Sequence, residues 1–366
     1  MRAVSKCART VLVVDDSAFM RRLITEMIDA HPGFRVIGSA RDGLDAMTQV
    51  RQLQPDMVTL DLEMPGLDGL RVLRRIMTES PRPIVVLSAG GAQYGDATMR
   101  ALELGAVDFV RKPSGPVSLD IALIRDRLIG ALEVASRATL ARPANVVDRA
   151  SAVAVTDSAM PGDVARHVVV IASSTGGPRA LTEIVPRLPA TLPAAVVIAQ
   201  HLPGDFAAAL VQRLSRASEI RVCEATDGMP LVSGSVYIAR GGANTTIDGP
   251  IAAPVLRRCA ADHDSDARTV ATPNADVLFR SAAEVFGAAC TGIVLTGMGR
   301  DGSDGLLQIR TSGGGAIVQD EMSSAIYGMP RAALAEAGAD HVVSLAMMAN
   351  AIIGMVPKER VECLTA

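Results

Sequence analysis

Five chemically capable side chains lie at the ends of short apolar runs in the first third of the sequence. The runs are VLVVDD, PDMVTLDL, RPIVVLSA and AVDFVRKP, and the residues are Asp15, Asp16, Asp61, Ser88 and Lys112. Carboxylates that lie close together repel one another unless a proton or a cation intervenes. Their hard oxygen atoms suit Mg²⁺, and a neighbouring ammonium or hydroxyl suits a phosphoryl group. The pattern predicts a pocket for a divalent cation and a phosphoryl group.

Lysine is rare in this chain, which makes Lys112 informative. Only three of the 36 basic residues are lysines, at positions 6, 112 and 358. The alternative is that acids at strand ends cap helices or form turns, and for a single acid the two interpretations are equally good. Several polar residues that all fall at strand ends favour a site.

A second candidate site begins in the segment VIASSTGGP, at Ser173 and Ser174. It has three interpretations: a phosphate-binding loop, a serine nucleophile or a polar turn. A phosphate loop of the GxxxxGK[ST] type needs a lysine, and none lies between Lys112 and Lys358. A nucleophile needs a base and a third group that orients the base.

His201 and Asp301 could supply those two groups. His201 ends the apolar run AAVVIAQH, and Asp301 follows the run GIVLTG. The other histidines begin a strand or lie in turn-like contexts; they are His31, His167, His263 and His341. A serine, a histidine and an aspartate at three parallel strand ends have the placement that a catalytic triad requires. Their order, and the lack of GxSxG, differ from the α/β-hydrolases, and spacing alone does not choose between the two serines.

Two series of alternating strands and helices must position these residues. In the first series we expect strands at 11–16, 34–40, 55–62, 82–89 and 106–113, each followed by a helix. In the second we expect strands at 167–172, 194–201, 291–297 and 315–320, and a strand or hairpin at 234–248. Alternation of this kind predicts parallel sheets with helices on both faces.

The fold class is therefore α/β in two domains. The first is a doubly wound, flavodoxin-like (βα)₅ domain at residues 8–130, and the second is a doubly wound, mostly parallel domain at 166–356. Residues 131–165 are rich in Ala, Ser, Asp and Pro and read as a linker.

Composition excludes several classes of function. The net charge is −3, Trp is absent and aromatic residues make up 2% of the chain, so we expect no binding to nucleic acid. No apolar run is long enough to enter a membrane as a span, and the N-terminus lacks a signal peptide. The five scattered cysteines favour reduced thiols. We expect a cytoplasmic monomer.

Residues 10–130 resemble a response-regulator receiver domain. The motifs VLVVDDSAFMRRLI, TLDLEMPGLDGL, VVLSA and GAVDFVRKP carry the resemblance. It implies that Asp61 accepts a phosphoryl group from a histidine kinase of the CheA type. It also implies that Asp16, Asp61 and the Glu63 carbonyl hold Mg²⁺, and that Asp15 completes the acidic pocket. The residues that would respond to phosphorylation are Ser88, Phe109 and Lys112.

The second domain resembles the CheB family of chemotaxis protein-glutamate methylesterases. The motifs are IASSTGGP, AQHLPGDF, VYIARGG, DVLFRS, TGIVLTGMGRDGSDGL and AIVQDEMSSAIYGMP. The resemblance implies hydrolysis of γ-glutamyl methyl esters on methyl-accepting chemoreceptors, and deamidation of receptor glutamines, with no cofactor at the esterase site. The roles it implies are Ser174 as nucleophile, His201 as base, Asp301 as its orienting partner, and the Thr175 and Met298 N–H groups as oxyanion donors.

Three positions depart from the family pattern. Arg240 stands where a proline is usual, Asn244 lies near a usual histidine, and TPNAD at 272–276 replaces RPSVD. These departures leave open which receptors are substrates and whether the pathway is flagellar chemotaxis.

Two other classes of function compete with the enzyme. The first is a non-enzymatic adaptor controlled by phosphorylation, and the presence of all three triad residues argues against it. The second is a transcriptional regulator, which the absence of a helix-turn-helix pattern argues against. We further hypothesise that the receiver restrains the second domain until Asp61 is phosphorylated.

Overall fold

The computed structural model describes residues 8–88, 92–112, 120–139, 162–259 and 272–357 of the chain. The chain divides into two compact units, residues 1–147 and 148–366. The expected linker at 131–165 lies partly outside the described residues. Each unit is described by itself below.

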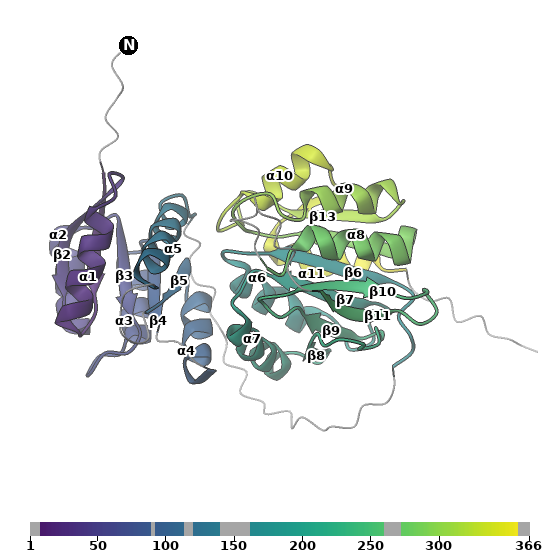
Figure 1. Ribbon diagram of the computed structural model, residues 1–366, viewed down its shortest axis with the longest axis horizontal. Coiled ribbons are helices and arrows are strands. Elements are labelled where there is room, and N and C mark those ends of the chain that lie inside the picture. The colour runs from purple at the N-terminus through teal and green to yellow at the C-terminus, as the bar shows by residue number, and fades with distance from the viewer. Residues whose placement is uncertain (1–7, 89–91, 113–119, 140–161, 260–271, 358–366) are drawn as a thin grey trace, which may run out of the picture. The chain divides into compact units, whose positions relative to one another are not determined.

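The first unit is a five-stranded parallel sheet in the order β2-β1-β3-β4-β5 (Figure 1). Its strands are β1 (Arg9–Val14), β2 (Phe34–Ala40), β3 (Met57–Asp61), β4 (Ile84–Ser88) and β5 (Asp108–Arg111). Its helices are α1 (Ala18–Asp29), α2 (Gly43–Leu53), α3 (Gly69–Glu79), α4 (Ala92–Glu103) and α5 (Asp120–Ala135). Helices α1 and α5 pack together, as do α2 with α3 and α3 with α4. This is the doubly wound (βα)₅ fold that the alternation predicts.

Short polar side chains begin three of these helices. Ser17, Asp42 and Asp68 have extended backbone and accept hydrogen bonds from N–H groups in the first turns of α1, α2 and α3. Such caps satisfy N–H groups that the helix itself leaves unpaired. They fix the point at which each strand-to-helix loop ends.

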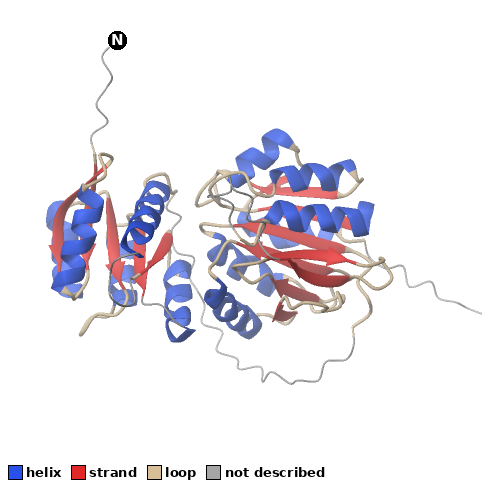
Figure 2. Cartoon of the chain, viewed as in Figure 1, coloured by secondary structure: helices blue, strands red, loops and turns tan. Residues whose placement is uncertain are grey.

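The second unit contains a seven-stranded parallel sheet in the order β14-β13-β12-β6-β7-β9-β8. Its strands are β6 (Val168–Ser173), β7 (Ala195–Gln200), β8 (Arg221–Glu224), β9 (Ser235–Ile238), β12 (Cys290–Val294), β13 (Gly315–Gln319) and β14 (His341–Val343). Strands β10 (Asn244–Asp248) and β11 (Val255–Cys259) form a separate antiparallel hairpin. The parallel α/β prediction is confirmed here too, and Figure 2 shows both sheets among their helices.

Helices cover both faces of the larger sheet (Figure 1). They are α6 (Gly177–Ile184), α7 (Gly204–Ala217), α8 (Ala275–Phe286), α9 (Ser303–Thr311), α10 (Met329–Glu336) and α11 (Leu345–Met355). Helix α6 packs against α7 and α11, while α9 packs against α8 and α10. The short 3₁₀ turns η1 (Val185–Arg187) and η2 (Gly287–Ala289) follow α6 and α8.

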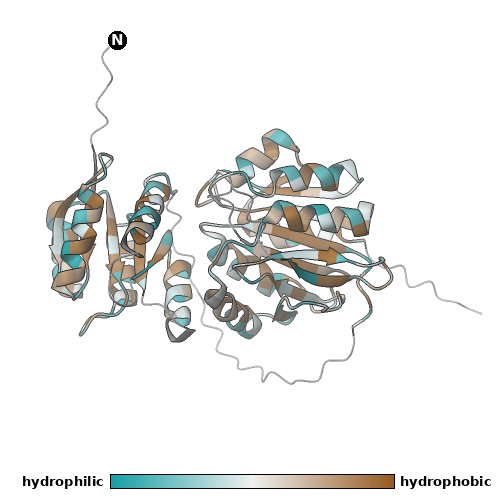
Figure 3. Cartoon of the chain, viewed as in Figure 1, coloured by the Kyte–Doolittle hydropathy of each residue, from teal (hydrophilic) through white to brown (hydrophobic). Residues whose placement is uncertain are grey.

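Apolar strands form the core of each unit. Strands β6 and β7 are buried at every residue, and Figure 3 shows hydrophobic strands beside helices of mixed character. Strands buried on both faces lack an alternating pattern, which is why they are visible in the sequence as continuous apolar runs.

Four elements were missed in the sequence: β8, β11, β14 and α11. The three strands are short, and their exposed residues break the apolar run. Helix α11 has the sequence LAMMANAIIGM and is apolar around most of its surface, so it shows little helical periodicity. His341, expected in a turn, lies on β14. No described helix is both long and apolar enough to cross a bilayer.

Candidate functional site

The first unit brings a lysine and two buried carboxylates together at the carboxyl edge of its sheet. The Lys112 Nζ lies 2.8 Å from Asp15 Oδ2 and 2.6 Å from Asp61 Oδ2. The carboxylates are almost fully buried, because Asp15 directly follows β1 and Asp61 ends β3, two interior strands of the sheet. One ammonium therefore bridges two acids that would otherwise repel each other.

Asp16 opens this pocket to solvent. Oxygen atoms of Asp15, Asp16 and Asp61 lie within 4.8 Å of one another, and Asp16 is exposed. Three hard carboxylate ligands with access to water suit Mg²⁺, which usually keeps several of its waters. The Glu63 N–H donates to Asp61 Oδ1 over 3.0 Å, which places that peptide at the pocket. The donor set therefore fits the predicted metal.

The charges in the pocket shift the pKa values of its members. Burial raises the pKa of Asp61, and the Asp15 charge adds to this, although Lys112 and the Glu63 N–H oppose it. Burial acts to lower the pKa of Lys112, but its hydrogen bonds and charge interactions with the two acids raise it overall. The site thus holds a carboxylate with a raised pKa beside an ammonium with a raised pKa. A bound cation would stabilise the acids in their ionised form.

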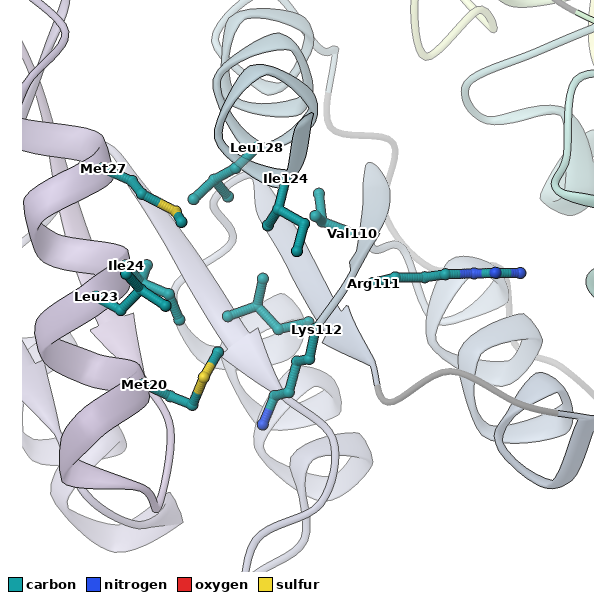
Figure 4. A pocket seen from close by; sticks show the side chains of 10 residues that line it. Met20, Leu23, Ile24, Met27, Val110, Arg111, Lys112, Ile124 and Leu128 are labelled. Carbon is teal, nitrogen blue, oxygen red and sulfur yellow. The ribbon is translucent and has the colours of Figure 1, made fainter. Parts of the chain in front are cut away.

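The other predicted residues of this unit lie on β4 and β5. Ser88 ends β4 and is buried, and it accepts a hydrogen bond from Thr98 Oγ1 at 2.8 Å. Phe109 is half-buried on β5. A small apolar pocket between α1 and α5 lies beside Lys112, and Figure 4 shows Arg111 extending away from it. The pocket surrounds the stem of Lys112 with apolar side chains.

The second unit places Ser174 and His201 next to each other at the carboxyl edge of its sheet. Ser173 on β6 is in register with Gln200 on β7, so Ser174 and His201 are the following pair. The His201 N–H donates to Ser173 O over 3.0 Å, and the Ser174 N–H donates to Thr296 O over 3.1 Å. Ser174 therefore lies between the ends of β7 and β12.

The structure separates the two serines that spacing could not. Ser173 is fully buried, and its Oγ donates to Gln200 Oε1 at 2.7 Å. Ser174 is only partly buried. A substrate could reach Ser174 but not Ser173, which favours Ser174 as the nucleophile.

Asp301 contacts the histidine through a short hydrogen bond. His201 Nε2 lies 2.7 Å from Asp301 Oδ2. The same carboxylate accepts hydrogen bonds from the N–H groups of Ala275 (2.8 Å) and Asp276 (3.0 Å), the first two residues of α8. A helix N-terminus favours negative charge. These contacts fix one carboxylate against one ring nitrogen.

The pKa of Asp301 is correspondingly low. Burial acts to raise it, but the hydrogen bond to His201, the His201 charge and the two N–H groups of α8 hold it below the ordinary value. Its neighbour Asp276 behaves in the opposite way, since burial and the charges of Asp301 and Asp304 raise the pKa of Asp276 to about 6. Asp301 is therefore the carboxylate that stays ionised.

The predicted oxyanion donors belong to backbone segments that border Ser174. Thr175 follows the serine, and its carbonyl accepts a hydrogen bond from Thr296 Oγ1 at 2.9 Å. A Cβ atom at Gly297 would lie only 2.8 Å from the Ser174 Cβ, so the chain just before Met298 runs directly against the serine. The structure thus brings all five predicted residues of this site to one edge; their roles stay predictions.

Four buried or partly buried polar residues around this site were not identified from the sequence. They are Gln200, Thr296, Asn274 and Asp276, and each bonds to the backbone or side chain of a predicted residue or to the helix that holds Asp301. The sequence carried one signal for them, a glutamine directly before His201 inside an otherwise apolar run. Their partners are distant in sequence, so no local pattern could identify them.

Each of the two units matches a known protein family. Residues 169–352 match the family described as CheB methylesterase, and residues 11–124 match the response regulator receiver domain. The two matches together include every predicted site residue.

Individual proteins are similar along nearly the whole chain. A protein-glutamate methylesterase/protein-glutamine glutaminase of Symbiobacterium thermophilum is 43% identical over 353 residues, which is 93% of this chain and 95% of that protein. One of the same name from Halalkalibacterium halodurans is 39% identical, over 94% of this chain and 97% of that protein. The Thermotoga maritima CheB methylesterase catalytic domain is 34% identical, covering 52% of this chain and 98% of that chain with a TM-score of 0.49.

Proposed function

The chain belongs to the CheB methylesterase family and carries a receiver domain, and from this premise we propose that Ser174, His201 and Asp301 form its catalytic triad and that phosphorylation of Asp61 activates it. It is an enzyme of the protein-glutamate methylesterase/protein-glutamine glutaminase class. The proposed substrates are γ-glutamyl methyl esters and glutamine side chains of methyl-accepting chemoreceptors, which this protein would meet in the cytoplasm.

The contact between His201 and Asp301 carries the proposal. Because Nε2 faces an ionised carboxylate at 2.7 Å, the neutral ring keeps its proton on Nε2. Nδ1 then holds the free lone pair, and in this proposal it faces Ser174, the residue beside His201 at the strand ends. This tautomer makes the histidine a base toward the serine hydroxyl.

Acylation follows from this arrangement. Nδ1 of His201 takes the Ser174 proton while Oγ attacks the ester carbonyl, and a tetrahedral intermediate forms. The imidazolium, stabilised by Asp301, then returns the proton to the departing methoxide. Methoxide is a poor leaving group, so this protonation matters. Methanol leaves, and glutamate stays attached to Ser174 as an acyl-enzyme.

Deacylation uses the same groups in reverse roles. His201 takes a proton from water, the hydroxide attacks the acyl carbonyl, and the proton passes to Ser174 Oγ as the glutamate carboxylate leaves. A glutamine side chain would follow the same path, with ammonia as the first product. The N–H groups of Thr175 and Met298 would stabilise the oxyanion, and loss of one such donor typically costs roughly 10²–10³ in rate.

The receiver supplies the regulation in this proposal. Asp61 would attack a phosphoryl group from a histidine kinase of the CheA type, with Mg²⁺ held by Asp16, Asp61 and the Glu63 carbonyl. Phosphorylation adds a charge of about −1.5 to −2, which Lys112, directly after β5, and Ser88, at the end of β4, would contact.

Methanol release from methylated receptors tests both the proposed triad and the proposed phosphoacceptor. Ser174→Ala should abolish release in protein whose urea unfolding transition is unchanged. A small acyl phosphate should stimulate the wild type in the presence of Mg²⁺ and leave Asp61→Asn at its basal rate. Wild-type release by Ser174→Ala would refute the triad, and stimulation of Asp61→Asn would refute the phosphoacceptor.

A further inference from the structure

Gln200 connects the proposed nucleophile to the proposed base. Its Nε2 donates to the Ser174 carbonyl over 2.9 Å and to the His201 carbonyl over 3.2 Å. The two hydrogens of one amide nitrogen thus reach the main chains of both residues. These bonds run between the two strand ends, just where the parallel ladder between β6 and β7 stops.

The other end of the same amide is held by Ser173. The Ser173 Oγ donates to Gln200 Oε1 at 2.7 Å. The two carbonyls require the NH₂ group on their side because they can only accept, and the Ser173 hydroxyl then holds the amide oxygen by donating to it. Both side chains are at most 1% exposed, so no solvent competes for these bonds.

Gly177 closes the space around the amide. A Cβ at Gly177 would collide with Gln200 Oε1 and would lie 2.9 Å from Gln200 Cδ. Any larger residue at position 177 would therefore displace the amide. The glycine at the start of α6 is thus explained by the side chain of Gln200 rather than by the turn alone.

We propose that Gln200, held in place by Ser173, is a positioning residue that sets the distance between Ser174 and His201. The inference rests on the proposed triad and deepens it. Proton transfer from Ser174 to His201 depends on their separation, and a displacement of about 1 Å can cost about 100-fold in rate. The amide bonds only the backbones of the two residues, so it acts on their placement and takes no part in the chemistry itself.

Three variants test this positioning role in the full-length protein. Gln200→Met keeps the size of the side chain and removes all three hydrogen bonds. Ser173→Ala removes only the bond that holds the amide oxygen, and Gly177→Ala keeps every polar group but pushes the amide away. Thr291→Val is the matched control, because it deletes a buried hydrogen bond, to His167, within the same sheet.

Two measurements are made for each variant. The first is methanol release, which gives KM and a kcat expressed per serine that reacts with a fluorophosphonate probe. The other is the rate constant for phosphonylation by that probe, which needs the serine and the histidine but no receptor. We expect Gln200→Met and Gly177→Ala to lower both rates about 10- to 100-fold with KM within about twofold. Ser173→Ala should lose less, and Thr291→Val should lose only stability.

The outcomes separate this inference from the proposed function. If Ser174→Ala is inactive while Gln200→Met and Ser173→Ala keep the wild-type kcat per reactive serine, the positioning role is wrong and the triad stands. If Ser174→Ala is active, the triad itself is wrong. Should Gln200→Met fail to fold, Ser173→Ala decides, since a wild-type phosphonylation rate in that variant refutes the proposal.

Discussion

Both units place carboxylates at the carboxyl edge of a parallel sheet, but they stabilise the negative charge by different means. In the receiver, Asp15 and Asp61 are buried side by side and share one ammonium, Lys112. In the catalytic unit, Asp301 accepts three hydrogen bonds, two of them from the start of α8. The pKa of Asp61 is raised by burial, whereas that of Asp301 is held low by its donors in spite of burial.

This difference matches the role proposed for each site. A phosphoacceptor pocket has to gain a cation and a phosphoryl group, so an incompletely compensated charge gives it affinity for both. A triad aspartate has to keep one charge in one place through the whole reaction, so its compensation is built into the fold. The substitutions below test this contrast. We expect the largest effect at Asp301, whose charge is balanced by three hydrogen bonds.

Asp301→Asn should lower kcat about 10⁴-fold. The asparagine oxygen can still accept from α8, but its NH₂ would then face His201 Nε2 and move the ring proton to Nδ1, where the serine needs a lone pair. Methanol release per folded protein measures the loss. Asp304→Asn is the control, because that exposed carboxylate pairs with Arg300 and lies outside the triad. A loss of less than tenfold in Asp301→Asn would contradict the assignment.

Lys112→Met should destabilise the receiver by about 2 kcal/mol at pH 7 without Mg²⁺. The two buried acids would then face each other without their ammonium. Millimolar Mg²⁺ should reduce the loss, and so should a lower pH, because protonation removes one of the repelling charges. Urea unfolding of the receiver, with and without Mg²⁺, measures it. Arg71→Met, which removes only an exposed ion pair, is the control, and a loss that Mg²⁺ leaves unchanged would argue against repulsion as its cause.

Asn274→Ala should destabilise the catalytic unit by about 1 kcal/mol, the usual cost of a lost N-cap. Asn274 accepts from the Val277 N–H and begins the helix whose first N–H groups hold Asp301. A fall in kcat should therefore accompany the loss of stability.

Asp42→Ala removes the corresponding cap from α2 in the receiver and should cost similar stability with unchanged basal kcat. Equal kcat in the two variants would show that α8 does not position Asp301. Urea unfolding and basal methanol release compare them directly.

Asp276→Asn should stabilise the catalytic unit slightly at pH 7 to 8. The pKa of Asp276 is raised from 3.8 to about 6, so the folded state binds its proton more tightly than the unfolded state does. The contribution of this group to stability therefore falls as pH rises from the lower value to the upper one, and asparagine removes that fall. Urea unfolding should show the gain above pH 6 and none below the unfolded value; a gain that is constant with pH would contradict this explanation.

The sequence predicted the elements that are buried on both faces. Strands such as β6, β7 and β12 are continuous apolar runs, and their carboxyl ends carry the predicted site residues. Edge strands such as β8 and β14 could not be recognised, because they are short and partly exposed and depend on their neighbours for their conformation. The all-apolar α11 lacked the periodicity that identifies a surface helix.

The residues of the candidate site could be predicted from the sequence, whereas the residues that hold them in position could not. Ser174, His201 and Asp301 follow strands, and parallel strands bring their ends to one edge. The choice of Ser174 over Ser173 required either a family resemblance or the burial seen here. Gln200 and Asn274 act through contacts with segments far away in sequence, which only the fold brings close.

The two α8 groups that hold Asp301 are backbone N–H groups. This affects which mutations the site can tolerate. A substitution at position 275 or 276 leaves the two N–H groups in place, because every amino acid except proline supplies one. A change in either codon can therefore spare the backbone anchor of Asp301, within the limit that the fully buried Ala275 side chain sets on size. In the receiver, by contrast, a single codon change at Lys112 removes the only ammonium seen to pair with both buried acids in the described part of the chain.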